Sequence, residues 1–254
     1  LGIESSCDET SASICIDGFI KSNVIATQAI HAKYGGVVPE LASRAHQQNI
    51  IPTIDQAIVQ AKITKNDVDA VAFTRGPGLL GSLLVGTSFA KSFALARNIP
   101  LIEVNHMQAH ILAHFIDDPK PSFPFLCLTV SGGHTQIVLV KDYFEMELIG
   151  QTLDDAAGEA FDKTAKILNL PYPGGPLIDK YGQLGDPNSF QLPEPKIADL
   201  NFSFSGLKTA ILYLVQDEVK KNPNFLDERL HDICASVQQR IVTILLNKVK
   251  KAAK

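Results

Sequence analysis

Two histidines four residues apart, His106 and His110, carry the strongest chemical signal in the sequence. They follow the apolar run 99–104, which predicts a strand that gives way to a helix near Asn105. On a helix, this spacing puts both imidazoles on one face, within reach of a single metal ion. His114 continues the spacing, which is also typical of a partly buried helix face, so both interpretations stay open. A metal site would need at least one further ligand, from the protein or from a substrate.

Small residues mark two candidate phosphate-binding turns. Residues 1–16 predict a strand, a Ser-rich turn and a second strand, and residues 124–140 repeat this plan around Ser131–Gly133. Backbone N–H groups in such turns bind anions, and the hydroxyls of Ser5, Ser6 and Ser131 can add donors. Either turn alone is explained as an ordinary hairpin, but their equivalent places in a repeat favour a nucleotide clamp.

Residues 154–163 concentrate four carboxylates ahead of a helical pattern. Such a cluster can hold Mg²⁺ or ribose hydroxyls, although acids at a helix start also act as caps and dipole partners. Asp162, one turn into the helix, is the acid least well explained as a cap. His134, directly after the Ser-Gly-Gly turn, either contacts a ligand or bonds across the hairpin.

The serines of segment 201–208 do not predict nucleophilic catalysis, because no histidine or acid lies at a telling distance from them. A helix cap by Ser203 or Ser205 explains them as well. We expect the basic end of the chain, 248–254, to be a solvated helix face.

The elements that position these residues alternate between strands and helices. In the first part of the chain, helices are predicted at 36–61 and 79–97, strands at 67–73 and 99–104, and a turn at 75–78. In the second part, the sequence predicts loops at 171–176 and 183–200 and helices at 207–220 and 226–254. The pattern indicates an α/β fold of two lobes, 1–123 and 124–254. No strand pattern follows the last helix, so the second lobe is expected to be incomplete.

Composition narrows the class of protein. The chain has 254 residues, of which 45% are hydrophobic, yet no run resembles a membrane span or a signal segment. Its four cysteines form no Cys-x-x-Cys pair, which favours a reducing compartment such as the cytoplasm. A net charge of -4 argues against a protein that binds nucleic acid by itself, because phosphate neutralisation needs a concentrated basic surface.

The chain contains six motifs in order: LGIESSCDET, HMQAH, VSGGHTQ, DDAAGEAFDK, YPGGP and NFSFSGLKTA. Together they resemble the universal tRNA threonylcarbamoyladenosine transferase family, once named glycoprotease or O-sialoglycoprotein endopeptidase. NFSFSGLK is similar to its bacterial and mitochondrial branch. The resemblance implies duplicated ribonuclease H-like lobes of the actin, sugar kinase and heat-shock ATPase type. It also implies transfer of a threonylcarbamoyl group from threonylcarbamoyl-adenylate to N6 of adenosine 37, releasing AMP, in tRNAs that read codons beginning with A.

The resemblance also assigns site residues. His106 and His110 match metal-binding histidines, and the ion implied is one divalent metal per subunit, with Fe²⁺ favoured over Zn²⁺. The residues that match an adenylate site are Thr129, Val130, Ser131, Gly132, Gly133, Asp162, Gly175 and Asp179; Ser5, Glu9 and His134 are further candidates. We expect the metal to orient or polarise the carbonyl-bearing part of the substrate, and the Ser-Gly-Gly amides to hold its phosphate. No general base is assigned.

The resemblance further implies partners and a longer chain. Members of the family work with a paralogous subunit of the same fold and a small P-loop ATPase, or, in mitochondria, as a homodimer in the matrix. They continue with a Gly-Gly-Val-x-x-Asn segment and a Thr-Asp-Asn segment that supplies a third metal ligand, and neither occurs here. We therefore expect weak metal retention and little transfer activity from residues 1–254 alone.

Two other functions compete with the transferase. A zinc metallopeptidase would place a glutamate after its first histidine as general base, but Met107 stands there, and Gln108 cannot act as a base. A catalytically silent scaffold of the same fold is the second alternative. The family's scaffold members typically lack the paired histidines, so the pair favours an enzyme.

Overall fold

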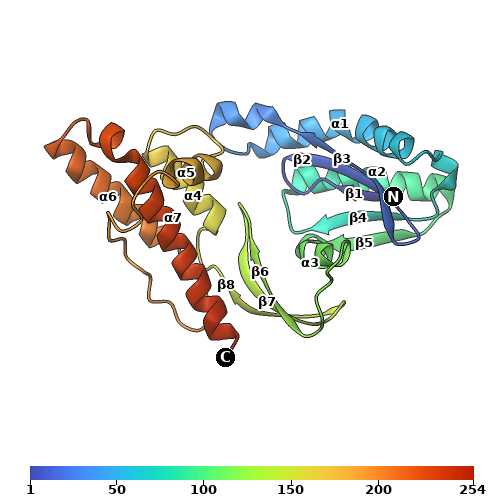
Figure 1. Cartoon of the computed structure of the whole chain (residues 1–254). Coiled ribbons are helices and arrows are strands. Elements are labelled where there is room, and N and C mark those ends of the chain that lie inside the picture. The colour runs from blue at the N-terminus through green and yellow to red at the C-terminus, as the bar shows by residue number, and fades with distance from the viewer. The chain divides into compact units, whose positions relative to one another are not determined.

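The computed structural model describes residues 1–254, which form two compact units, Leu1–Pro121 and Ser122–Lys254. Each unit has its own sheet and its own helices (Figure 1). Each also has its own apolar core. The predicted α/β class is confirmed.

The first unit is a five-stranded mixed sheet in the order β3-β2-β1-β4-β5. Its strands are β1 (Gly2–Glu4), β2 (Glu9–Ile16), β3 (Phe19–Thr27), β4 (Val71–Gly76) and β5 (Leu101–Asn105). The first three form an antiparallel meander, and β4 and β5 add to it in parallel. Helices α1 (Pro39–Gln60) and α2 (Leu80–Arg97) pack on one face (Figure 1). There Ile3, Ile14 and Phe73 meet the helices, because alternate strand residues point to the same face.

Most predicted elements of this unit are confirmed, and two differ. The strand expected at 67–73 starts only at Val71, because Thr64 and Asp67 close a 3-10 turn at Lys65–Asp67 through reciprocal capping bonds. It then runs to Gly76, into the expected turn. The strand β3 was not predicted, because its outward side chains include exposed Phe19 and Ile25, which hide the alternation. Short helices also lie at Ala29–Tyr34, His106–Leu112 (α3) and Ala113–Phe115.

The second unit packs helices on a three-stranded antiparallel sheet, β6-β7-β8. Its elements are β6 (Phe125–Val130), β7 (Thr135–Asp142), β8 (Glu145–Gln151), α4 (Ala157–Ile167), α5 (Gly175–Gly182), α6 (Ser205–Lys221) and α7 (Phe225–Ala252). The fully buried Phe202 and Phe204 lie in the core with Ile178, Ile211 and Ile241. Two elements were not predicted: β8, and α5, which starts just after the expected proline and glycine loop.

The segment 183–200 is irregular, as predicted, but side chains of α7 hold it along its length. Asp232 accepts from the N–H of Asp186 at 2.8 Å, and Ser236 accepts from that of Phe190 at 3.2 Å. Further along, Lys248 Nζ donates to the carbonyls of Ile197 and Asp199, each at 2.8 Å. The basic end is therefore not simply a solvated face, because Lys248 anchors this segment. No helix in the structure is long and apolar enough to cross a membrane.

Candidate functional site

The histidine pair sits where β5 gives way to α3, as the sequence predicts. Asn105 caps α3: its side-chain oxygen accepts the N–H groups of Met107 at 2.9 Å and Gln108 at 3.2 Å. His106 and His110 are the first and fifth residues of the helix. Their Nε2 atoms lie 3.1 Å apart, and the rings meet edge to face at 85°. The two imidazoles therefore converge on one point.

This geometry fits a metal ion. Two nitrogens that each lie 2.0–2.1 Å from a tetrahedral ion are about 3.3 Å apart, close to the separation found here. Burial lowers the pKa of His110, and the neighbouring His106 lowers it further, while Glu4 acts in the opposite direction. The lower pKa favours the neutral imidazole, which is the form that binds metals. Within residues 1–254, no group of three or more His, Cys, Asp or Glu side chains is arranged around one ion.

Glu4, which the sequence analysis missed, supports His106 from behind. Its Oε2 lies 3.5 Å from His106 Nδ1, and its Oε1 accepts the N–H of Ser6 at 2.5 Å. Burial alone would raise the pKa of Glu4, but hydrogen bonds from His106, Ser6 and Thr74 outweigh it and lower the pKa to about 2. A carboxylate that accepts from Nδ1–H keeps the proton on Nδ1, so that Nε2 carries the lone pair that binds a metal. The available signal was an acid at the end of an apolar strand, just before the Ser-Ser turn.

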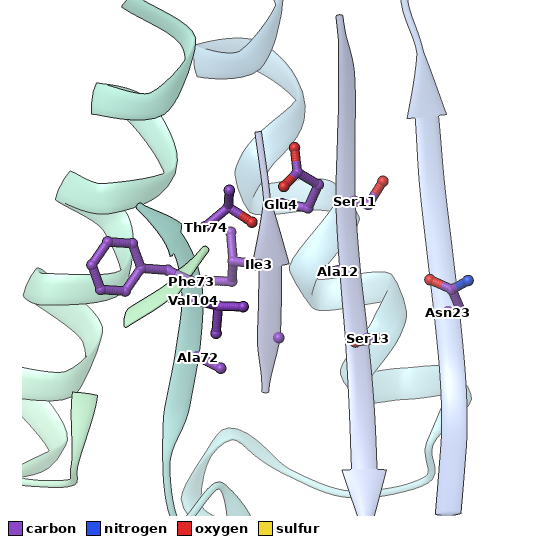
Figure 2. Close-up of a pocket in the computed structure, with 11 residues that line it drawn as sticks. Ile3, Glu4, Ser11, Ala12, Ser13, Asn23, Ala72, Phe73, Thr74 and Val104 are labelled. Atoms are coloured by element: carbon purple, nitrogen blue, oxygen red, sulfur yellow. The ribbon is translucent and has the colours of Figure 1, made fainter. Parts of the chain in front are cut away.

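A pocket of about 220 Å³ opens beside Glu4, on the sheet surface that α1 and α2 do not cover. Figure 2 shows the Glu4 carboxylate at the end of β1, with Thr74 beside it and Ser11 on the next strand. Glu4 is the one charged residue in a mostly uncharged lining, and it is also the residue that contacts His106.

In the first predicted phosphate turn, both serine hydroxyls contact other parts of the protein. Ser5 is buried and donates to the carbonyl of Ser82 on α2 at 2.9 Å, so its hydroxyl ties the turn to the helix. Ser6 is also buried, with its hydroxyl 3.3 Å from His106 Nδ1. Glu9 is exposed at the start of β2. The expected donor role of Ser5 and Ser6 stays a prediction; in the structure Ser5 ties the turn to α2, and Ser6 lies beside His106.

The second turn is open. Ser131 closes it, donating its N–H to the carbonyl of His134 at 2.8 Å and accepting the N–H of His134 on its hydroxyl at 3.0 Å. Gly132 and Gly133 are exposed, and a side chain at either would meet no atom within 4 Å. The start of α4 lies against the turn: a Cβ on Gly158 would come 2.7 Å from the Ser131 carbonyl. The turn and the helix start thus form one concave piece of backbone.

The remaining predicted residues extend this surface along α4 and α5. Asp162, one turn after Gly158 on α4, accepts the N–H of Gly174 at 2.8 Å, which fastens the start of α5 to α4. Gly175 is the first residue of α5, and Asp179 lies one turn further, exposed. The recorded contacts are therefore between the turn and the start of α4, and between Asp162 and the residue before Gly175, all within one unit.

Three further candidates lie near the turn. Thr129 is buried near the end of β6, and Val130, its last residue, is 43% exposed. His134 is half-buried just after the turn.

The acidic cluster proves to be mostly structural. Asp154 accepts from the hydroxyls of Ser203 at 2.5 Å and Ser205 at 2.6 Å, and from the N–H of Phe204 at 2.8 Å. It therefore caps the start of α6, and the predicted cap by a serine is wrong. Lys163 holds Asp155 at 2.6 Å and Glu159 at 2.9 Å.

Comparison with known proteins gives a consistent result. The profile of the family described as tRNA N6-adenosine threonylcarbamoyltransferase matches residues 19–254. The protein of that name from Christiangramia forsetii is 67% identical over 257 residues, covering 100% of this chain and 76% of the relative. The one from Riemerella anatipestifer is 66% identical over 256 residues, covering 100% and 75%. Among solved structures, YeaZ from Pseudomonas aeruginosa is a distant match, with 17% identity, a TM-score of 0.40, and 58% of this chain and 61% of that one covered. The chain belongs to the tRNA N6-adenosine threonylcarbamoyltransferase family.

Proposed function

We propose that this protein transfers a threonylcarbamoyl group from threonylcarbamoyl-adenylate to N6 of adenosine 37, in tRNAs that read codons beginning with A. In this reaction N6 bonds to the carbamoyl carbon, the bond from that carbon to the phosphate oxygen breaks, and AMP leaves. The N6 proton passes to a base that we do not assign. The observation that carries the proposal is the convergence of His106 and His110 at 3.1 Å in a chain of this family.

The residues divide the work by chemistry. His106 and His110 would hold a divalent metal through Nε2, and the family resemblance favours Fe²⁺ over Zn²⁺; imidazole suits both. When bound, the metal supplies a Lewis acid. Glu4 fixes the orientation and tautomer of His106.

The second turn would bind the nucleotide. In this proposal the phosphate approaches the turn at the exposed Gly132 and Gly133, whose missing side chains leave the backbone open, because the Ser131 N–H is already bound to the His134 carbonyl. The neighbouring Asp162, Gly175 and Asp179 would take the adenosine part. An exposed carboxylate such as that of Asp179 is suited to accept ribose hydroxyls, which donate hydrogen bonds.

The two units support a duplicated fold of the actin and sugar kinase type as a proposal. In each unit an antiparallel meander of three strands comes first, β1-β2-β3 and β6-β7-β8. The small negative net charge, -4, supports sharing tRNA binding with other subunits. We propose a paralogous subunit of the same fold and a small P-loop ATPase as those partners, and the cytoplasm as the location.

The peptidase alternative lacks a base on α3. Met107 follows His106 where a peptidase needs glutamate, and the carboxylate nearest the pair, Glu4, is bound to His106 Nδ1 and Ser6.

The test supplies the intact gene product with threonylcarbamoyl-adenylate and unmodified tRNA, and measures threonylcarbamoyladenosine by mass spectrometry of nucleosides. We expect His110→Ala to lower the rate by more than about 100-fold, because loss of an outer-shell partner alone costs about 10- to 100-fold. His114→Ala is the matched control, since His114 is exposed on the same stretch and continues the spacing. Transfer by His110→Ala at the wild-type rate would contradict the proposal.

A further inference from the structure

Helices α5 and α7 cross at unusually close range. A Cβ on Gly182 would lie 3.3 Å from the Ala235 backbone, and one on Gly185 would overlap the His231 backbone. Asp179 lies one turn before Gly182, and Gln238 lies one turn after Ala235. The close crossing therefore brings Asp179 and Gln238 together, although they are 59 residues apart in sequence.

The two side chains form a direct hydrogen bond. Gln238 Nε2 donates to Asp179 Oδ1 at 2.8 Å, and Gln183 Nε2 donates to the other oxygen, Oδ2, at 3.2 Å. The Oε1 of Gln238 is buried without a partner. The opposite amide orientation would set this oxygen against a carboxylate, which only accepts, so the contact itself determines which end of the amide faces Asp179.

We propose that Gln238 is a positioning residue, which fixes the Asp179 carboxylate in the orientation that accepts the hydroxyls of a ribose diol. This inference rests on the proposed nucleotide role of Asp179. An exposed aspartate samples several rotamers, whereas recognition of two adjacent hydroxyls needs one of them. Gln238 supplies the restraint from a packed helix, while the second restraint, Gln183, comes from the end of α5 itself.

The experiment measures the dissociation constants of AMP and of 2′,3′-dideoxy-AMP by calorimetry with the intact gene product. Gln238→Leu removes the donor at nearly constant volume, and Gln238→Met is a second variant in case the first does not fold. The control is Gln239→Leu, because Gln239 is exposed and its amide reaches only Thr243, at 3.4 Å. Asp179→Asn tests the proposed site itself, and thermal unfolding checks each variant.

We expect Gln238→Leu to weaken AMP binding by about 10- to 100-fold, in line with the loss of a hydrogen bond to a charged group, and to leave dideoxy-AMP binding within about 2-fold. Asp179→Asn should show the same selective loss, and Gln239→Leu none. Combining Gln238→Leu with Asp179→Asn should add little, because the two act through one contact.

The other outcomes overturn the inference in separable ways. If Asp179→Asn weakens AMP binding selectively and the Gln238 variants do not, the nucleotide site stands and the positioning role fails. Equal losses for AMP and dideoxy-AMP in the Gln238 variants would show a merely structural role. If Asp179→Asn leaves AMP binding unchanged, the proposed function of Asp179 fails, and the role of Gln238 fails with it.

Discussion

Glu4 and His106 act as a pair, because the carboxylate lies on the Nδ1 side of the ring and leaves Nε2 directed toward His110. Metal-bound histidines commonly have such a carboxylate partner, which fixes the ring and raises its basicity. Glu4 is therefore as much a part of the candidate metal site as the two imidazoles.

Replacing Glu4 should weaken metal binding without removing a ligand. We expect Glu4→Gln to lower the affinity for Fe²⁺ or Zn²⁺ by about 10- to 100-fold, because the amide holds His106 less firmly. Metal titration of the purified protein measures this. Glu103→Gln is the control, since Glu103 is 63% exposed on β5 and pairs with Arg75. Equal affinities for the Glu4 variant and the wild type would disprove the supporting role.

Among the site residues, those related by local spacing could be predicted from the sequence, and those brought together by long-range contacts could not. His106 and His110 could be predicted because their relation depends only on one helix. Glu4 and Ser5 could not, because β1 meets its neighbours through pairing with β4, far along the chain, and through α2. Sequence alone shows Ser5 as a donor, but not that Ser82 already takes its hydroxyl.

Among the elements, α6 depends on a cap from outside its own segment. Asp154 takes the place of an N-cap side chain by accepting from Phe204 N–H and the flanking serine hydroxyls. We expect Asp154→Ala to lower the free energy of unfolding by about 1–2 kcal/mol at neutral pH, measured by urea denaturation. Asp117→Ala, at an exposed loop position, should change it little.

The same cap gives a pH dependence. Burial alone would raise the pKa of Asp154, but the hydrogen bonds outweigh it and lower the pKa below the usual 3.8. A lowered folded-state pKa contributes stability above the unfolded value, and that contribution is lost as the pH falls through the folded one. The stability difference between wild type and Asp154→Ala should therefore narrow below about pH 4; a constant difference would contradict the cap.

The contact of α4 with the Ser-Gly-Gly turn gives another prediction. Gly158→Ala places a methyl group 2.7 Å from the Ser131 carbonyl and 2.8 Å from Gly132 Cα, so the turn must move. We expect AMP binding to weaken by about 10-fold or more, measured by calorimetry, because a shift of about 1 Å in a positioning group has large effects. Gly206→Ala is the control for a glycine-to-alanine change in a helix, since a Cβ at Gly206 meets nothing within 4 Å.

Most helices and the two hairpins could be predicted from pattern, whereas the edge strands β3 and β8 and the short helix α5 could not. α2 carries a small-residue pattern that suits packing on a sheet, and the strands β2 and β7 alternate clearly. In β3 and β8, exposed Ile25 and Leu148 break the apolar and polar alternation. α5 was masked by Pro173 and Gly174, although Pro176 is well suited to a first helical turn.

At the scale of the whole molecule, the two units have separate cores. We expect calorimetry to resolve two unfolding transitions, of which Asp154→Ala lowers only one, by about 4 °C for a loss near 1 kcal/mol. A single transition that shifts as a whole would show that the units unfold together. The division into two lobes can be predicted from the length of the chain and its repeated pattern. Whether the two lobes unfold independently depends on which side chains pack together, which the sequence does not reveal.

The segment 183–200 has a consequence for how the molecule responds to cleavage. Its backbone is irregular, yet hydrogen bonds to Asp232, Ser236 and Lys248 tether it to the 28-residue helix α7. A protease can cleave this backbone only after the segment has opened locally, so these hydrogen bonds would have to break first. Irregular backbone in this enzyme is therefore not an easy place to cut.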